Sequence, residues 1–147
     1  YQTFNRFTMA LPRGIRNNNP LNIRKGNDWL GERPIQKDRA FEEFVSLEMG
    51  LRAGFIILRN YQRPQLHPSL RANTIRKIIT RWAPASENNT ARYIDVVAKR
   101  TGLNPDELIA FKDKAKVLAL VEAMCFVECG QPIDKEILSS VYELIRK

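Results

Sequence analysis

The sequence contains one histidine and two cysteines, too few for a zinc site built from His and Cys ligands. Ser-His-Asp and Cys-His mechanisms would depend on His67 alone, which lies between Leu66 and Pro68 in a predicted loop. Cys125 and Cys129 are four residues apart in one helical pattern among apolar neighbours. We expect buried free thiols there, because a disulfide at that helical spacing has poor geometry. No metal or organic cofactor is predicted.

The chain also lacks long apolar runs and blocks of charge. No apolar run reaches the roughly 18 residues of a membrane-spanning helix, and no cleaved secretory signal is visible. No run of five like charges occurs, which argues against a disordered basic tail. The 24 Lys and Arg nevertheless exceed the 16 Asp and Glu, a formal charge of +8. This balance favours an anionic partner such as nucleic acid or the bacterial wall; the alternative is a basic protein with no nucleic-acid role.

Length and composition predict one domain. A chain of 147 residues with 44% hydrophobic content can bury a core of its own. We assign residues 1–12 to an N-terminal extension and residues 13–147 to the domain. Met9 can be a natural start, which would make residues 1–8 an upstream extension.

Six helices are predicted from apolar periodicity and capping residues. Ser46, Thr74 and Asp134 are predicted N-caps. A Gly pair at i and i+4, Gly50 and Gly54, indicates close approach of another backbone. The predicted helices run from Leu47 to about Tyr61, from Thr74 to Pro84, from Ala91 to about Arg100, from Asn104 onward, from Lys114 to Cys129, and from Asp134 onward.

The stretch between Arg13 and Phe44 lacks helical periodicity and is rich in Asn, Gly and Pro. Such composition is typical of turns. Short segments within it, Asn22–Arg24, Gly31–Gln36 and Ala40–Val45, predict a small sheet of two or three strands. The expected fold class is therefore mainly α (α+β), with about six helices and a small β-lobe.

Four segments resemble a known family: RGIRNNNPLNIRKGNDWLGE, FEEF, GLRAG and RWAPASENNTARYIDVVAKRTGLNPDE. Their order and spacing are similar to phage and prophage proteins with an RGIRNNNPGNIR signature. Those proteins are labelled virion structural proteins and suspected lysins. The resemblance covers residues 13–107 and departs at Leu21, where the family usually has Gly.

A second resemblance concerns glucosaminidase and lytic transglycosylase domains of the lysozyme superfamily. The Asn18–Arg24 turn and Trp29-Leu30-Gly31 are similar to their Asn-rich turn and Trp-x-Gly hairpin, and Trp82 and Tyr93 resemble their late aromatic positions. The resemblance implies a lysozyme-like fold. Those enzymes place an acidic Glu just before the Asn-rich turn, whereas residues 1–16 contain no Asp or Glu.

Glycan cleavage needs a carboxylic acid that stays protonated in a partly apolar site. Glu87 is the first candidate, because Trp82-Ala83-Pro84 precedes it and three polar residues follow it. The alternative for Glu87 is a charge that complements a helix N-terminus. Glu32 is the second candidate, with a surface charge beside Arg33 as its alternative.

Polar and aromatic side chains around these acids are candidates for sugar binding. Amides donate and accept hydrogen bonds, which suits sugars, but the same residues make turns. Trp29 suits stacking on a sugar, with a lid over a small core as the alternative. Arg13, Arg16 and Arg24 suit peptide-stem carboxylates or phosphates. The substrate-binding candidates are Asn17, Asn18, Asn19, Trp29, Asn88, Asn89, Thr90 and Tyr93.

These features predict a phage- or prophage-derived protein that acts on peptidoglycan by cleaving glycan strands. The alternative is a non-catalytic virion structural or wall-binding module, and the third possibility is a nucleic-acid-binding protein. The expected partners are peptidoglycan and other virion proteins. The expected location is the virion, or the host cytoplasm with action in the periplasm.

Overall fold

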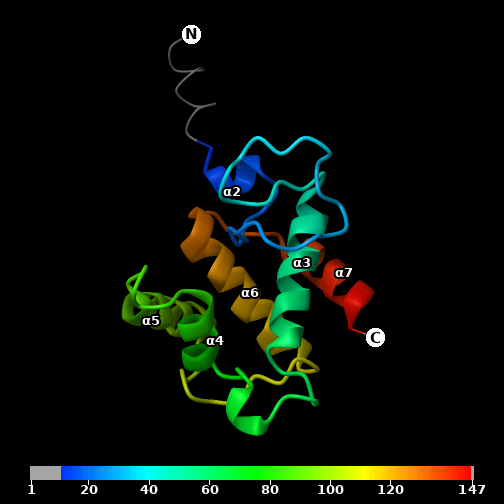
Figure 1. Cartoon of the computed structure of the whole chain (residues 1–147). Helices are drawn as coiled ribbons and strands as arrows, with labels where there is room; N and C mark the ends of the chain where they lie inside the picture. Colours follow the sequence, from blue (N-terminus) through cyan, green and yellow to red (C-terminus); the bar gives the residue numbers. More distant parts are fainter. Residues whose placement is uncertain (1–10, 147) are drawn as a thin grey trace.

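A computed structural model describes residues 11–146, so most of the predicted N-terminal extension, including Met9, lies outside the described residues. The described chain is mainly α-helical, as predicted. Figure 1 shows α6 through the middle, with α3 and α7 on one side, α4 and α5 on the other, and the long loop before α3 at the end where α2 lies. The elements are α2 (Arg13–Arg16), α3 (Leu47–Asn60), the 3-10 helix η1 (Pro68–Leu70), α4 (Ile75–Trp82), α5 (Thr90–Thr101), α6 (Lys114–Cys129) and α7 (Lys135–Ile145).

The helix boundaries follow from capping chemistry. Ser46, Thr74 and Asp134 each accept a hydrogen bond from a backbone N–H of the first turn, as predicted. Gly102 and Gly130 end α5 and α6 in the left-handed conformation that glycine adopts without strain. One apolar core spans α3 to α7, and α6 contributes six buried residues to it.

The predicted helix starting at Asn104 is wrong. Asn104 Oδ1 accepts from the backbone N–H of Asp106 at 2.8 Å, and Glu107 Oε1 accepts from the backbone N–H of Asn104 at 2.8 Å. The capping pattern therefore forms, but only as a turn. The backbone N–H of the fully buried Ile109 donates instead to Asn73 O at 2.7 Å, so tertiary pairing overrides local propensity.

The predicted small sheet also does not form among the described residues. Two isolated antiparallel bridges, Arg24–Phe41 and Glu32–Phe44, are the backbone pairing that replaces it. Gly26 and Gly31 have positive φ values of 148° and 85°, which break extended structure between the bridges. Residues 17–46 are thus an irregular loop, called the Asn-rich loop below.

The Asn-rich loop packs directly on α3 where Gly50 lies. A Cβ added to Gly50 would lie 1.9 Å from the carbonyl oxygen of Asn18. One turn later, a Cβ on Gly54 would meet Cδ1 of Leu21 at 2.2 Å. Close backbone approach is therefore confirmed at Gly50, whereas at Gly54 the neighbour is a buried side chain.

We predict that Gly50→Ala lowers the free energy of unfolding by at least about 2 kcal/mol, because backbone atoms must move. Gly54→Ala should cost less, about 1 kcal/mol, because the end of the Leu21 side chain can rotate. Urea unfolding followed by circular dichroism measures both. Equal losses in the two variants would contradict the backbone contact as the cause.

Candidate active site

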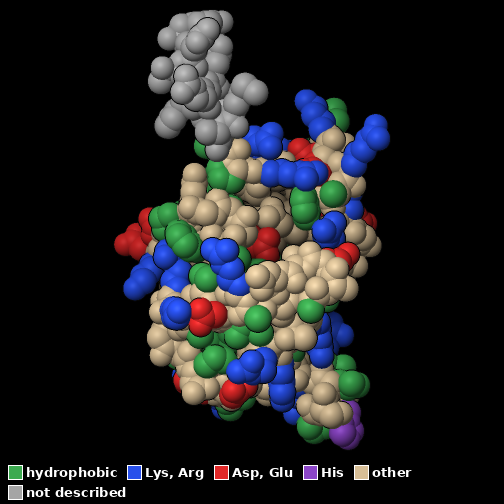
Figure 2. All heavy atoms as spheres, turned by 90° about the vertical axis from the view of Figure 1, so that its left-hand side faces the viewer, with side chains coloured by type: hydrophobic (Ala, Val, Ile, Leu, Met, Phe, Trp, Pro, Cys, Tyr) green, Lys and Arg blue, Asp and Glu red, His purple; other side chains and the backbone are tan. Residues whose placement is uncertain are grey.

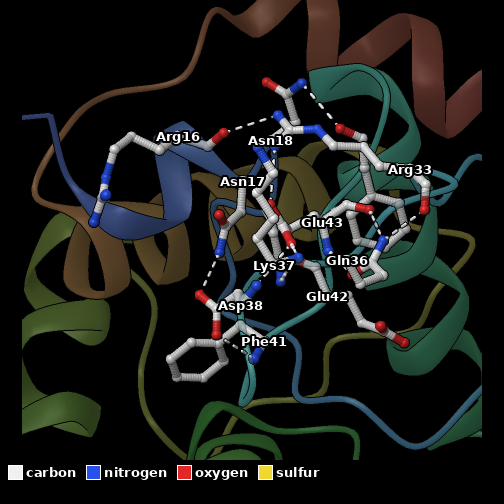
Figure 3. A network of polar contacts seen from close by, with 12 residues as sticks. Arg16, Asn17, Asn18, Arg33, Gln36, Lys37, Asp38, Phe41, Glu42 and Glu43 are labelled. Atoms are coloured by element: carbon white, nitrogen blue, oxygen red, sulfur yellow. Dashed lines mark hydrogen bonds and ion pairs between the residues drawn. The ribbon is translucent and has the colours of Figure 1, made fainter.

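Three consecutive asparagines tie the Asn-rich loop together, and Figure 3 shows two of them, Asn17 and Asn18. Asn19 is fully buried; its amide donates to the carbonyls of Ile23 and Glu42 at 2.9 and 3.0 Å, and its Oδ1 accepts from Ile23 N–H. Asn18 has a φ of 52° and donates to Phe44 O at 3.1 Å. Asn17 donates to a carboxylate at 2.9 Å. These contacts match the turn-making interpretation of all three residues.

Two carboxylates replace the missing strand pairing within this loop. Asp38 accepts two hydrogen bonds from Arg13, each 2.5 Å long, and others from the backbone N–H groups of Ala40 and Phe41. The Arg13 guanidinium holds the pKa of Asp38 far below its usual range. Glu43 accepts from the backbone N–H of Asp38 at 2.8 Å, and this bond lowers its pKa. Both groups therefore remain anions inside the loop.

Glu32 lies beside a second buried acid rather than on the open surface. Its carboxylate accepts from the backbone N–H of Trp29 at 2.7 Å, and its charge acts on the neighbouring carboxyl of Glu42. Glu42 is 2% exposed, and burial and the neighbouring Glu32 raise its pKa to about 7. Trp29 is half-buried against the core, which matches the lid interpretation of this residue.

This pair predicts a stability change with pH. Because the folded-state pKa of Glu42 is raised, the folded protein binds more protons than the unfolded chain between about pH 4.5 and 7. The contribution of Glu42 is therefore present below pH 4.5 and is lost as pH rises through 7. Relative to Glu42→Gln, the wild type should lose stability between pH 5 and 8, by at most about 3 kcal/mol.

Urea unfolding at pH 5 and pH 8 tests this, with Glu48→Gln, an exposed acid on α3, as the control. The control should leave the pH dependence of the wild type in place. A Glu42→Gln variant with the same pH dependence as the wild type would contradict the assignment.

An open groove lies between the Asn-rich loop and the α4–α5 corner. Its main part has a volume of about 320 Å³, and a neighbouring part of about 460 Å³ shares Asn88 and Glu128 with it. Figure 2 shows a hollow across this face, with an acidic side chain recessed in it. Polar and aromatic side chains line the main part, among them Asn22, Arg24, Phe41, Tyr61, Trp82 and Glu87.

Glu128, near the C-terminus of α6, is the acid where both parts of the groove meet. Its Oε1 accepts from the amide of Asn22 at 3.0 Å, and its Oε2 accepts from the hydroxyl of Tyr93 at 2.9 Å. The same Asn22 amide also lies 3.2 Å from the Glu128 backbone carbonyl. Asn22 reaches this position with a φ of 52°, a conformation that Asn tolerates better than most residues. The Asn-rich loop and α5, far apart in sequence, thus each donate a hydrogen bond to this carboxyl group of α6.

Burial raises the pKa of Glu128 above its ordinary value. Hydrogen bonds from Asn22 and Tyr93, the neighbouring Trp82 and the charge of Arg24 oppose that shift without cancelling it. Burial and, after it, the charge of Glu128 raise the pKa of Tyr93, which stays a neutral donor. A partly buried carboxyl with a raised pKa at an open groove can hold a proton and donate it to a bound molecule.

The structure brings together only some of the predicted site residues. Glu87 and Asn88 are exposed and line the main groove, and Asn88, Asn89 and Tyr93 line its neighbouring part. Asn89 also caps α5. Thr90 is buried, and its hydroxyl donates to the Ala83 carbonyl beneath the surface.

The remaining predicted residues lie apart from the groove. Asn17, Asn18, Asn19, Trp29 and Glu32 are not among the residues that line either part of it.

Sequence reasoning missed Glu128 and Asn22 as groove residues, whereas Arg24, a predicted partner of carboxylates or phosphates, does line the groove. Glu128 follows Phe126 and Val127 in an apolar helix, where a charged residue signals a buried partner or a site. The other acid of that helix, Glu122, pairs with Arg100 at 2.8 Å. Within residues 11–146, no cluster of three or more His, Cys, Asp or Glu side chains is placed to hold a metal ion.

No protein-family model matches this sequence. The chain is 40% identical over 122 residues to Protein P5 of Pseudoalteromonas phage PM2, an alignment that covers 80% of this chain and 71% of that protein. The chain belongs to the family of this phage protein. The predicted phage origin is thereby confirmed. Among the described residues, no helix is long and apolar enough to cross a membrane.

The geometry at Glu128 predicts the effect of Tyr93→Phe. Because the Tyr93 hydroxyl donates to the carboxylate, its removal should raise the pKa of Glu128 further. Carbon-13 NMR of labelled glutamate carboxyls measures this titration, and Glu128→Gln identifies the signal. Tyr61→Phe, a change in a groove residue that makes no hydrogen bond to Glu128, is the control. An unchanged or lowered pKa in Tyr93→Phe would contradict the contact.

Proposed function

We propose that this phage protein cleaves the glycan strands of peptidoglycan, with Glu128 as the general acid. The observation that supports the proposal most is the recessed Glu128 carboxyl, whose pKa burial raises, at the centre of an open groove. Sugar-binding sites combine aromatic faces with amides and charged groups. Tyr61, Trp82 and Asn88 supply that combination here.

The proposed reaction begins with a protonated Glu128. Glu128 gives its proton to the glycosidic oxygen as the bond to the sugar breaks, and the carboxylate that remains accepts from Asn22 and Tyr93. Glu87 lines the same groove and is the second carboxylate, which activates water or stabilises positive charge on the sugar. An attacking water gives a hydrolase, whereas attack by a hydroxyl of the sugar itself gives a transglycosylase.

We propose a lysozyme-like site in which the acid lies at a different position in the chain. The lysozyme-superfamily enzymes that the Asn-rich turn resembles place Glu before that turn, where residues 1–16 here have no Asp or Glu. In the structure α6 brings Glu128 to Asn22 of that same turn. We place the acid on α6, opposite the turn, and keep the predicted virion association and peptidoglycan partner as parts of this proposal.

A second candidate function is a non-catalytic component of the phage particle that binds the wall or other virion proteins. One observation favours it: both Glu128 oxygens already accept hydrogen bonds from protein donors, as in a structural carboxylate. The nucleic-acid hypothesis has less support, because no zinc-ligand cluster is present among the described residues and the basic residues are dispersed over loops and helix faces.

The test is release of soluble muropeptides from purified bacterial sacculi, resolved by mass. Wild type should release them, and Glu128→Gln should lower the rate by at least about a hundredfold, because it removes the proton donor. Glu87→Gln should lower it less, and Glu32→Gln, outside the groove, should be close to wild type. Anhydro-muramic ends would identify a transglycosylase and reducing ends a hydrolase.

Circular dichroism and the urea midpoint of each variant control for folding. Full activity in a folded Glu128→Gln would exclude this acid. Wild type that pellets with sacculi but releases nothing would leave the non-catalytic candidate.

A further inference from the structure

A second concave site lies on the outer side of the Asn-rich loop, beside α2. It has a volume of about 570 Å³ and is lined by five basic and two acidic side chains, a formal charge of +3. We call it the basic pocket; its cations are Arg13, Arg16, Arg33, Lys37 and Arg39.

The two acids of the basic pocket already accept hydrogen bonds from protein donors on both carboxylate oxygens. Asp38 forms an ion pair with Arg13 at 2.5 Å, and Glu43 forms one with Arg33 at 3.2 Å. Backbone N–H groups of the loop occupy the remaining positions on both carboxylates (Figure 3). These two ion pairs fix one side of the basic pocket, and each carboxylate charge is compensated by an arginine.

The other three cations stay available. The side chains of Arg16, Lys37 and Arg39 are exposed and make no hydrogen bond or ion pair with another residue of the 11–146 range. Arg16 is held by its backbone, whose carbonyl accepts from Arg33 at 2.8 Å. Three uncompensated charges around one concavity attract an anion.

One aromatic ring separates the basic pocket from the groove. The guanidinium of Arg13 lies 4.6 Å from the centre of the Phe41 ring, and that of Arg24 lies 5.2 Å from it. Phe41 and Arg24 line the groove, whereas Arg13 lines the basic pocket. A polymer in the groove that carries a short branch can therefore place the branch over Phe41.

We infer that the basic pocket binds the carboxylates of the peptide stem that branches from the glycan strand. This inference rests on the proposed function, because it places the strand in the groove. Guanidinium and ammonium groups suit carboxylates. A nucleic acid would need a track of cations along successive phosphates, whereas Arg16, Lys37 and Arg39 surround one compact hollow.

The experiment uses the tripeptide L-Ala-γ-D-Glu-meso-diaminopimelate and its form with amidated carboxyls, in NMR titrations. A variant with Arg16, Lys37 and Arg39 changed to Gln should bind the free-acid tripeptide at least about tenfold more weakly than wild type. The matched control changes Lys77, Lys112 and Lys135 to Gln, which are exposed on other parts of the chain. The control should retain wild-type affinity, and the amidated tripeptide should bind wild type as weakly as the free acid binds the pocket variant.

Three results would overturn the inference: equal binding of the amidated tripeptide, equal losses in both triple variants, or loss of duplex-DNA binding in the pocket variant with tripeptide binding intact. The outcome is separable from that of the proposed function, because Glu128→Gln should keep tripeptide binding while losing muropeptide release. Tripeptide binding by a wild type that releases nothing would support the pocket and exclude cleavage.

Discussion

The Asn-rich loop depends on side chains to satisfy its buried backbone groups. A loop of about thirty residues without strands would leave many N–H and C=O groups unpaired, and each buried one costs free energy. Asn19, Asp38 and Glu43 take the place of the missing ladder. Because a carboxylate accepts several bonds at once, two acids can fix a stretch of chain that a sheet would otherwise organise.

The same constraint positions the candidate site. Once Asn19 fixes the turn, Asn22 adopts its left-handed conformation and its amide meets Glu128 across the groove. Gly50 lets the turn approach α3 closely enough for this contact. Loop stability and the acidity of Glu128 are therefore linked: a change that loosens the turn removes a donor from the carboxylate and raises its pKa.

The helices were predictable because their signals are local. Ser46, Thr74 and Asp134 cap helices wherever they precede an apolar periodic segment. The Asn104 signal failed because Ile109 pairs with Asn73, a contact that no local pattern encodes. The β-lobe failed for a related reason: in sequence, Asp38 and Glu43 are ordinary charges, and only the fold shows them buried as acceptors.

Part of the candidate site was predictable from local sequence signals, and part depends on contacts between distant segments. Glu87 and Tyr93 stand out as polar or aromatic residues near a loop, and both line the groove. For Glu128 the only sequence signal is its place after Phe126 and Val127 in an apolar helix, and that signal does not distinguish a site from a buried partner. The position of Glu128 depends on where Asn22 lies, more than a hundred residues earlier.

The direction of the pKa shift of each buried or partly buried acid depends on the groups around its carboxyl. Asp38 and Glu43 each accept from charged arginines and backbone N–H groups, and their pKa values fall. Glu42 has another acid as its neighbour, and Glu128 has neutral donors and a more distant Arg24, so burial prevails and both pKa values rise. Of the two acids with raised pKa values, only Glu128 lines the groove. A proton that burial keeps on a carboxyl group is useful only where a substrate can reach it. This is the physical reason for assigning the chemistry to Glu128 and the pH-dependent stability to Glu42.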